Sequence, residues 1–116
     1  MDKEPQDFWQ MLDALVAESE VVIDRPAGSF HPRYPAVRYP LDYGYLCNTC
    51  SMDGAGIDVW VGSLPGRTVT AAFCTVDRVK RDSEIKLLLG CTPAEKQCAL
   101  AFHRDNGQGV LLIERP

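Results

Sequence analysis

Two aspartates in a glycine-rich segment are the first residues of this sequence that could do chemistry. The segment runs Ser51-Met52-Asp53-Gly54-Ala55-Gly56-Ile57-Asp58-Val59, so the first carboxylate lies in a turn and the second enters a strand. A turn can fold back so that both side chains meet at one cation, and Mg²⁺ prefers such hard oxygen ligands. A second interpretation stays open, because an Asp-Gly turn before a strand is also typical of a plain hairpin.

A second cluster mixes acidic and basic side chains between residues 77 and 86. It contains Asp77 and Asp82, and its last residues, Glu84 and Lys86, point to the same face of an expected strand. A carboxylate beside a lysine suits a site where a metal ion and a phosphate oxygen meet. The alternative is a solvated hairpin tip, for which a dense run of charges is also typical.

The third candidate is the proline-rich stretch 26–41. Its arginines, Arg33 and Arg38, could bind phosphate with a two-pronged guanidinium. Tyr39, Tyr43 and Tyr45 follow and could add neutral hydroxyl donors, although such tyrosines also serve as core residues with a solvated hydroxyl. We therefore interpret this stretch as a stiff loop with a binding role.

The histidines and cysteines give no metal pattern. His31 and His103 are the only histidines, and each is interpreted first as a surface or packing residue. Cys47-x-x-Cys50 lacks a second ligand pair at zinc spacing, so zinc is not expected. The odd count of five cysteines favours reduced thiols.

Bulk properties narrow the class of protein. The 116 residues suit one domain, and 46% hydrophobic with 24% charged residues is an ordinary globular balance. A net charge of −4 argues against a nucleic-acid partner. No apolar run is long enough for a membrane partner, and the polar start is not typical of a secretory signal. We expect a cytoplasmic protein.

The elements that must position these residues follow from hydrophobic periodicity and turn residues. Apolar residues at helical spacing predict a helix over 5–19, and Thr92-Pro93-Ala94-Glu95 is typical of a capped helix start that Gly107 would end. Strands are expected at 20–24, 43–47, 57–61, 67–79, 84–89 and 109–114. This order predicts a mainly β fold with flanking helices, either a small barrel or a strongly curved sheet.

Three stretches, taken in order, resemble the soluble (family I) inorganic pyrophosphatases. They are Val22-Ile23-Asp24-Arg25-Pro26-Ala27-Gly28, Tyr39-Pro40-Leu41-Asp42-Tyr43-Gly44-Tyr45-Leu46, and the segment from Ser51 to Val59. The resemblance covers the chain from about Val21 to about Leu112. It implies one domain over 1–116 with an OB-like five-stranded β-barrel, Mg²⁺ as cofactor, and hydrolysis of pyrophosphate to two phosphates.

The same resemblance implies roles for individual residues. Asp53 and Asp58 match metal-binding aspartates, and Tyr43 matches a tyrosine that touches phosphate or the nucleophile. Further metal positions fall on Asp24, Glu84 and one of Asp77 or Asp82. The residues implied to bind the phosphates are Arg33, Arg38, Lys86, His103 and Arg104.

The sequence also departs from the family pattern. Ala55 stands where the family has a middle aspartate that bridges metals and activates water, and Gly56 replaces a proline. A hairpin between Tyr34 and Tyr39 is missing. A weakened enzyme, a module that only binds a phosphorylated metabolite, a phosphohydrolase for a larger phosphoanhydride and an interaction protein without a ligand therefore all stay open. Because family members often form homo-oligomers, a second copy of the chain is one implied partner.

Overall fold

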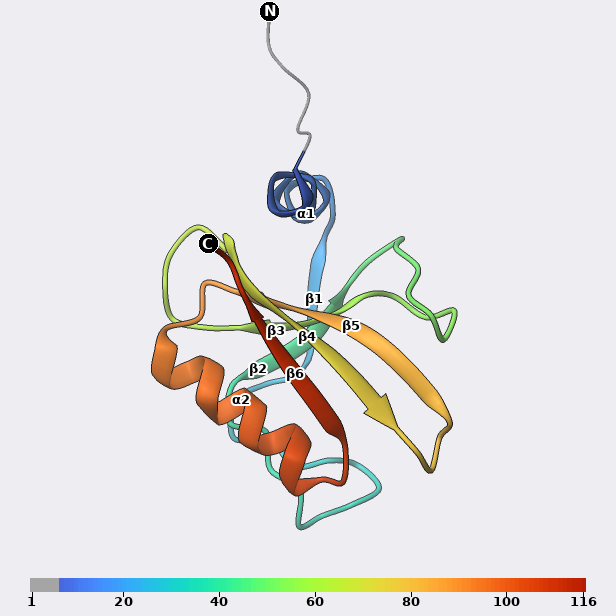
Figure 1. Cartoon of the computed structure of the whole chain (residues 1–116). Coiled ribbons are helices and arrows are strands. Elements are labelled where there is room, and N and C mark those ends of the chain that lie inside the picture. The colour runs from blue at the N-terminus through green and yellow to red at the C-terminus, as the bar shows by residue number, and fades with distance from the viewer. Residues whose placement is uncertain (1–6) are drawn as a thin grey trace, which may run out of the picture.

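The computed structural model describes residues 7–116, which form a six-stranded sheet and two helices (Figure 1). In chain order the elements are α1 (Phe8–Ala17), β1 (Val21–Arg25), β2 (Asp42–Leu46), β3 (Asp58–Val61), β4 (Val69–Asp77), β5 (Asp82–Leu89), α2 (Pro93–Asp105) and β6 (Gly109–Glu114). The prediction of a mainly β fold with flanking helices is confirmed.

The sheet has the order β1-β2-β3-β5-β4-β6. All neighbouring strands are antiparallel except β3 and β5, which run parallel. Within the described residues β1 and β6 form the two outer edges and do not pair with each other. The sheet is therefore open, and the expected closed five-stranded barrel is not what the strand pairing shows.

Local sequence explains where the helices begin. Asp7 caps α1 by accepting a hydrogen bond from the Gln10 N–H. Thr92 and Glu95 form the expected capping box at the start of α2, with Pro93 in the first turn. The predicted first helix began at residue 5, and that part of the prediction lies outside the described residues.

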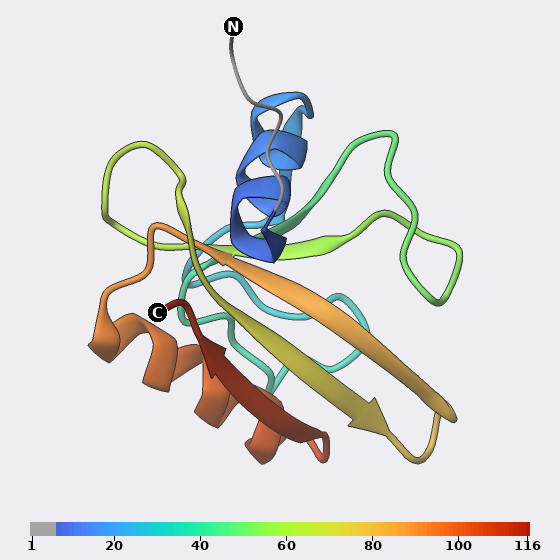
Figure 2. The same ribbon diagram turned by 45° about the horizontal axis from the view of Figure 1, so that its top comes forward.

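The two faces of the sheet carry separate hydrophobic clusters. One cluster places Trp60, Phe73 and Leu88 against Ala99 and Leu100 of α2. The other lies on the α1 side of the sheet and joins Val16 to Leu46, Val59, Val69, Ala72, Leu87 and Leu89. In Figure 2, α1 stands in front of the sheet and α2 lies on its far side.

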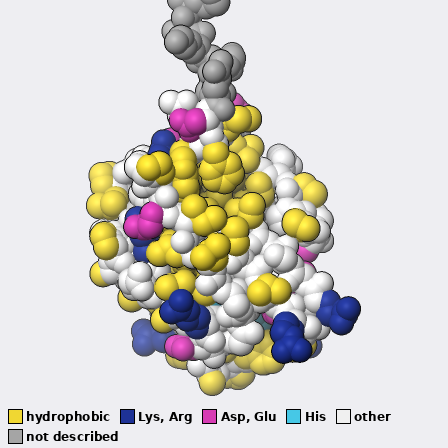
Figure 3. Space-filling view, viewed as in Figure 1, with side chains coloured by type: hydrophobic (Ala, Val, Ile, Leu, Met, Phe, Trp, Pro, Cys, Tyr) yellow, Lys and Arg dark blue, Asp and Glu magenta, His cyan; other side chains and the backbone are white. Residues whose placement is uncertain are grey.

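The cover provided by α1 is incomplete. Ile85, Leu111 and Ile113 remain 46%, 62% and 38% exposed beside it. In the space-filling view, hydrophobic side chains gather below α1 over a broad area (Figure 3). In residues 7–116 neither helix is long and apolar enough to cross a membrane. The five cysteines, all in this part of the chain, are free.

Candidate functional site

Three adjacent strands bring Tyr43, Asp58 and Lys86 to one face of the sheet. Tyr45 lies opposite Asp58 across the β2–β3 pair, and Tyr43 lies two residues earlier on the same face. Val59 lies opposite Leu87 across the parallel β3–β5 pair, which sets Asp58 beside Lys86. Glu84 precedes Lys86 by two residues in β5, so it joins the same face.

These four side chains, here called the charged cluster, are directly bonded. The Tyr43 hydroxyl donates to Asp58 Oδ2 at 2.6 Å, and Lys86 Nζ donates to the same oxygen at 2.8 Å. Lys86 Nζ also lies 3.0 Å from the Tyr43 hydroxyl and 3.5 Å from Glu84 Oε2. The Lys86 side chain is only 7% exposed, so this ammonium group depends on the cluster for its solvation.

The charges of the cluster shift its pKa values. Burial, followed by the negative charge of Asp58, raises the pKa of Tyr43 well above its ordinary value, so the phenol keeps its proton. Burial also raises the pKa of Glu84; the Lys86 ammonium lowers it, while the charges of Asp53 and Asp58 raise it. The two carboxyl groups of Asp58 and Glu84 thus contact one ammonium, which leaves an excess of negative charge.

Asp53 reaches the cluster from the loop between β2 and β3. The turn that holds it is closed by the Ser51 N–H, which donates to the Ala55 carbonyl at 2.7 Å, and Gly54 supplies a φ of 84°. The Ala55 N–H donates to Asp53 Oδ1 at 2.9 Å and lowers the pKa of that carboxyl group. Asp53 and Glu84 also influence each other's pKa, and the charge of Asp53 adds to burial in raising the pKa of Glu84.

The donor chemistry of this pair fits Mg²⁺. Both residues supply hard carboxylate oxygens, and Mg²⁺ is commonly held by one or two carboxylates with waters and substrate phosphates. Within residues 7–116 no group of three Asp, Glu, His or Cys side chains could by itself hold a metal ion. Asp53 and Glu84 supply the kind of oxygen donor that a magnesium ion shared with a substrate takes.

The structure places three other predicted metal ligands outside the charged cluster. Asp24 is exposed and lies 3.9 Å from the Arg25 guanidinium. Asp77 Oδ1 accepts hydrogen bonds from the N–H groups of Val79 and Lys80, which fixes the turn after β4. Asp82 lies opposite Asp77 in the backbone register at the end of the β4–β5 hairpin.

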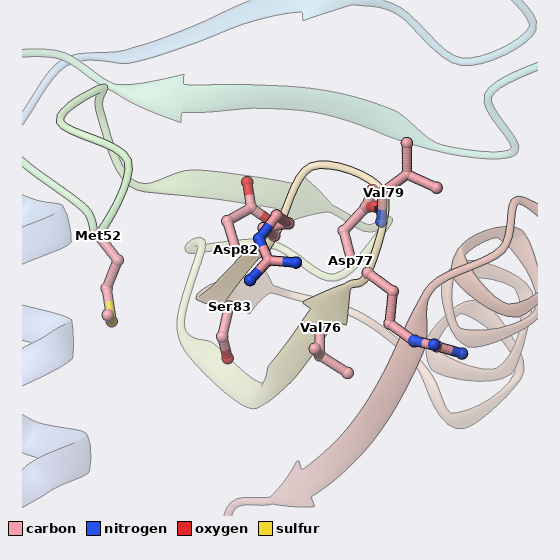
Figure 4. Close-up of a pocket in the computed structure, with 8 residues that line it drawn as sticks. Met52, Val76, Asp77, Val79, Asp82 and Ser83 are labelled. Atoms are coloured by element: carbon pink, nitrogen blue, oxygen red, sulfur yellow. Dashed lines mark hydrogen bonds between the residues drawn. The ribbon is translucent and has the colours of Figure 1, made fainter.

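This hairpin end borders a hollow of about 900 Å³. Figure 4 shows Met52 on one side of it and the hairpin residues on the other. Its lining residues are Met52, Val76, Asp77, Arg78, Val79, Arg81, Asp82 and Ser83. The hollow adjoins the Asp53 loop, but Lys86 does not line it, so the charged cluster and the hollow are neighbouring features.

His103 is a correction to the predicted set of phosphate ligands. It is 3% exposed and lies in the core, where its Nε2 accepts from the Trp60 indole N–H at 3.0 Å. Its Nδ1 lies 2.6 Å from Gln108 Oε1, so both ring nitrogens are already paired. Burial lowers its pKa to about 4, and a neutral, buried imidazole has no free donor for phosphate. Arg104, the next residue, is exposed in the last turn of α2.

The predicted phosphate-binding arginines lie in the loop before β2. Arg33 is exposed, and its backbone N–H donates to His31 Nδ1 at 3.0 Å. Arg38 is exposed and donates from Nε to the Gly28 carbonyl at 3.3 Å. Neither arginine has a hydrogen bond to the charged cluster among the described residues.

Arg25 was missed by the sequence-based reasoning. Its guanidinium donates to the Asp24 carbonyl at 3.2 Å, and its positive charge adds to burial in lowering the pKa of His31. The available signal was its position directly after Asp24 in the Val-Ile-Asp-Arg-Pro stretch.

Comparison with known proteins supports the fold. The structure is similar to an inorganic phosphatase from Anaplasma phagocytophilum, with a TM-score of 0.54 and 16% sequence identity over 81% of each chain. No protein-family model matches the sequence. No curated protein matches it significantly. Residues 7–116 thus have an inorganic-pyrophosphatase-like fold, with six strands and two helices.

Proposed function

We propose that this protein hydrolyses inorganic pyrophosphate to two phosphates in a reaction that requires Mg²⁺. The observation that carries the proposal is the buried ammonium of Lys86, held by Asp58, Tyr43 and Glu84 beside the Asp53 loop. This arrangement combines an anion-binding charge with surplus carboxylates, which is what a metal–phosphate substrate requires. The fold shared with an inorganic phosphatase supports the same class of reaction.

The residues of the chain would bind and orient the substrate. Lys86 would neutralise charge on the phosphoryl group, and its three contacts keep its ammonium in a fixed position, which limits reorganisation during the reaction. Asp58 Oδ2 is engaged by Lys86 and Tyr43, whereas Oδ1 has no hydrogen bond within residues 7–116. That free oxygen could accept a proton from a water molecule positioned to attack phosphorus.

The exposed arginines would act on the outer part of the substrate. Arg33 and Arg38 would contribute positive charge from the loop before β2, where both side chains are accessible. Mg²⁺, held by Asp53 and Glu84, would neutralise phosphate charge and lower the pKa of bound water. The protonated phenol of Tyr43 would keep Asp58 oriented through its 2.6 Å hydrogen bond.

Phosphate release from pyrophosphate by the purified protein, with Mg²⁺ and with EDTA, tests the proposal. We expect release with Mg²⁺, none with EDTA, and at least a 100-fold loss in Asp58→Asn. Asp105→Asn, which changes an exposed aspartate at the end of α2, is the matched control and should retain activity. Release that EDTA does not affect, or that survives Asp58→Asn, would contradict the proposal.

A second candidate function is a module that binds a phosphate compound without hydrolysing it. Two observations favour it: Ala55 supplies no carboxylate, and no three described ligands are arranged for a metal. Such a module would show a higher melting temperature with Mg²⁺ and pyrophosphate but release no phosphate. Turnover in the assay above would exclude it.

A further inference from the structure

The loop before β2 is held in a defined shape and carries exposed aromatic and basic side chains. The Gly28 N–H donates to the Tyr39 carbonyl at 2.8 Å, and the His31 N–H donates to the Val37 carbonyl at 2.8 Å. The Val37 N–H donates to the Tyr34 carbonyl at 2.9 Å and closes the tip. These bonds fix the positions of the rings that the loop presents.

A continuous series of ring contacts leads from this loop to the charged cluster. The rings of Tyr34 and His31 have centroids 5.0 Å apart, and His31 is stacked on Tyr39 at 6.4 Å with an interplanar angle of 14°. Tyr39 is 5.6 Å from Tyr43, whose hydroxyl contacts Asp58 and Lys86. Tyr34 is the outermost ring of the series and is 59% exposed.

Positive charge surrounds the middle of this series. Burial lowers the pKa of His31, and the positive charges of Arg25, Lys80 and Arg33 lower it further. The Arg33 N–H donates to His31 Nδ1 at 3.0 Å, so this ring nitrogen accepts a hydrogen bond and the imidazole adds a flat ring without adding charge. Tyr34 and His31, here called the ring surface, are therefore bordered by cations on the route to the charged cluster.

Bare pyrophosphate offers nothing for an exposed ring to contact, because all of its surface is oxygen-rich and charged. A nucleobase, in contrast, stacks on an aromatic side chain and does so with little dependence on which base it is. A nucleoside polyphosphate carries both parts, a flat ring at one end and phosphoanhydride groups at the other.

We propose that the ring surface of Tyr34 and His31 binds the base of a nucleoside 5′-polyphosphate whose phosphates lie at the charged cluster. This inference rests on the proposed function, since it names the substrate class of that same site. In the reaction, a water oxygen forms a bond to the terminal phosphorus and the bridging P–O bond breaks. A nucleoside diphosphate and water thus yield a nucleoside monophosphate, inorganic phosphate and one proton released to solvent, with no oxidant or reductant.

The experiment compares pyrophosphate with ADP, GDP, CDP and UDP, using the full chain with Mg²⁺. Phosphate release gives kcat/KM, and isothermal titration calorimetry gives the Kd of each nucleotide, also without added metal. The variants are Tyr34→Ala and Tyr34→Trp. Phe30→Ala is the matched control, because Phe30 lies in the same loop with 58% exposure but makes no ring contact within the described residues.

We expect Tyr34→Ala to weaken nucleotide binding and kcat/KM by about 5- to 150-fold, the range typical of losing one stacked base. Tyr34→Trp should restore both values, Phe30→Ala should change neither, and pyrophosphate hydrolysis should stay within about twofold throughout. Pyrophosphate turnover without nucleotide binding would overturn the inference and leave the proposed function intact. An equal effect of Tyr34→Ala on pyrophosphate and nucleotides would overturn it too. Tyr34-dependent nucleotide binding without pyrophosphate turnover would support the inference and contradict the proposed function.

Discussion

Two assemblies of buried polar side chains lie on the same face of the sheet and differ in how fully they are satisfied. The charged cluster joins Lys86 to three acceptors, yet Asp58 keeps one oxygen free. The histidine network, formed by Trp60, His103 and Gln108, uses both ring nitrogens of His103. The family resemblance implied a phosphate-binding residue in each, Lys86 in the first and His103 in the second, but only the first has capacity left for a ligand.

The difference follows from charge and from neighbours. In the histidine network the neutral tautomer is fixed, because Nε2 accepts from Trp60 and Nδ1 must then carry the proton toward Gln108 Oε1. In the charged cluster burial raises the pKa of Glu84, the carboxyl groups of Asp53 and Asp58 raise it further, and the single ammonium of Lys86 opposes them. A closed neutral network stabilises a fold, whereas surplus negative charge around a lysine favours binding of a cation with its anion.

Removing Lys86 should give the largest loss of activity and should distinguish the charged cluster most clearly from the histidine network. Lys86→Met is expected to lower phosphate release at least 100-fold, because charge on the transferring phosphate loses its fixed cation. The protein should still fold, since Glu84, whose pKa is already raised, can take up a proton. Phosphate release measured together with thermal melting checks both parts. A variant that keeps activity within a few-fold of the parent would show that the charged cluster is not the active site.

For the histidine network we expect the opposite result, a loss of stability without a loss of activity. His103→Leu leaves the Trp60 indole N–H buried without an acceptor, which should lower the free energy of unfolding by about 2–3 kcal/mol. The activity of the folded fraction should not change. Urea denaturation and kcat/KM measure the two effects, and Trp60→Phe added to His103→Leu should recover part of the loss. A selective rise in KM for substrate, without loss of stability, would show that His103 does contribute to substrate binding.

Lowering the pH should destabilise the protein through the same histidine network, without any mutation. The pKa of His103 is lowered from 6.5 to about 4, so the unfolded chain binds a proton at a higher pH than the folded chain does. Stability is therefore lost as the pH falls through 6.5 toward 4, by about 2 kcal/mol between pH 7 and pH 5. Urea denaturation across this range measures the loss, and His103→Gln should reduce it. An unchanged slope in that variant would contradict the assignment.

The sequence predicted local structure better than it predicted closure of the sheet. The capping box of α2 was predictable because Thr92 and Glu95 interact within one turn. Each strand was placed to within two residues, because alternation and β-branched residues are local signals. The expected barrel depended on pairing between β1 and β6, which are far apart in the chain, and no local pattern specifies that pairing.

For the candidate site too, local patterns in the sequence did not specify contacts between residues that are far apart in the chain. Tyr43, Asp58 and Lys86 were predicted together because the family resemblance orders them along the chain, and their hydrogen bonds depend on β2, β3 and β5 being adjacent. The family resemblance implied a phosphate-binding role for His103, whereas its interpretation as a packing residue agrees with its buried position, and a local signal pointed the same way. His103 follows Ala99 and Leu100 by four and three residues, the spacing of one helix face, and both of those residues are buried.

The smallest effect is expected at Ala55, and it tests whether the charged cluster lacks a carboxylate. The Ala55 side chain is exposed, and its N–H already donates to Asp53, so an aspartate here adds charge without removing that bond. We expect Ala55→Asp to leave phosphate release unchanged or raise it by about two- to fivefold, less than one kcal/mol in the barrier. Ala94→Asp, at an exposed alanine in the first turn of α2, is the matched control for added negative charge. Lower turnover in Ala55→Asp than in both the parent and this control would mean that position 55 has no place near the metal, and that the resemblance to the pyrophosphatase turn ends at Asp53 and Asp58.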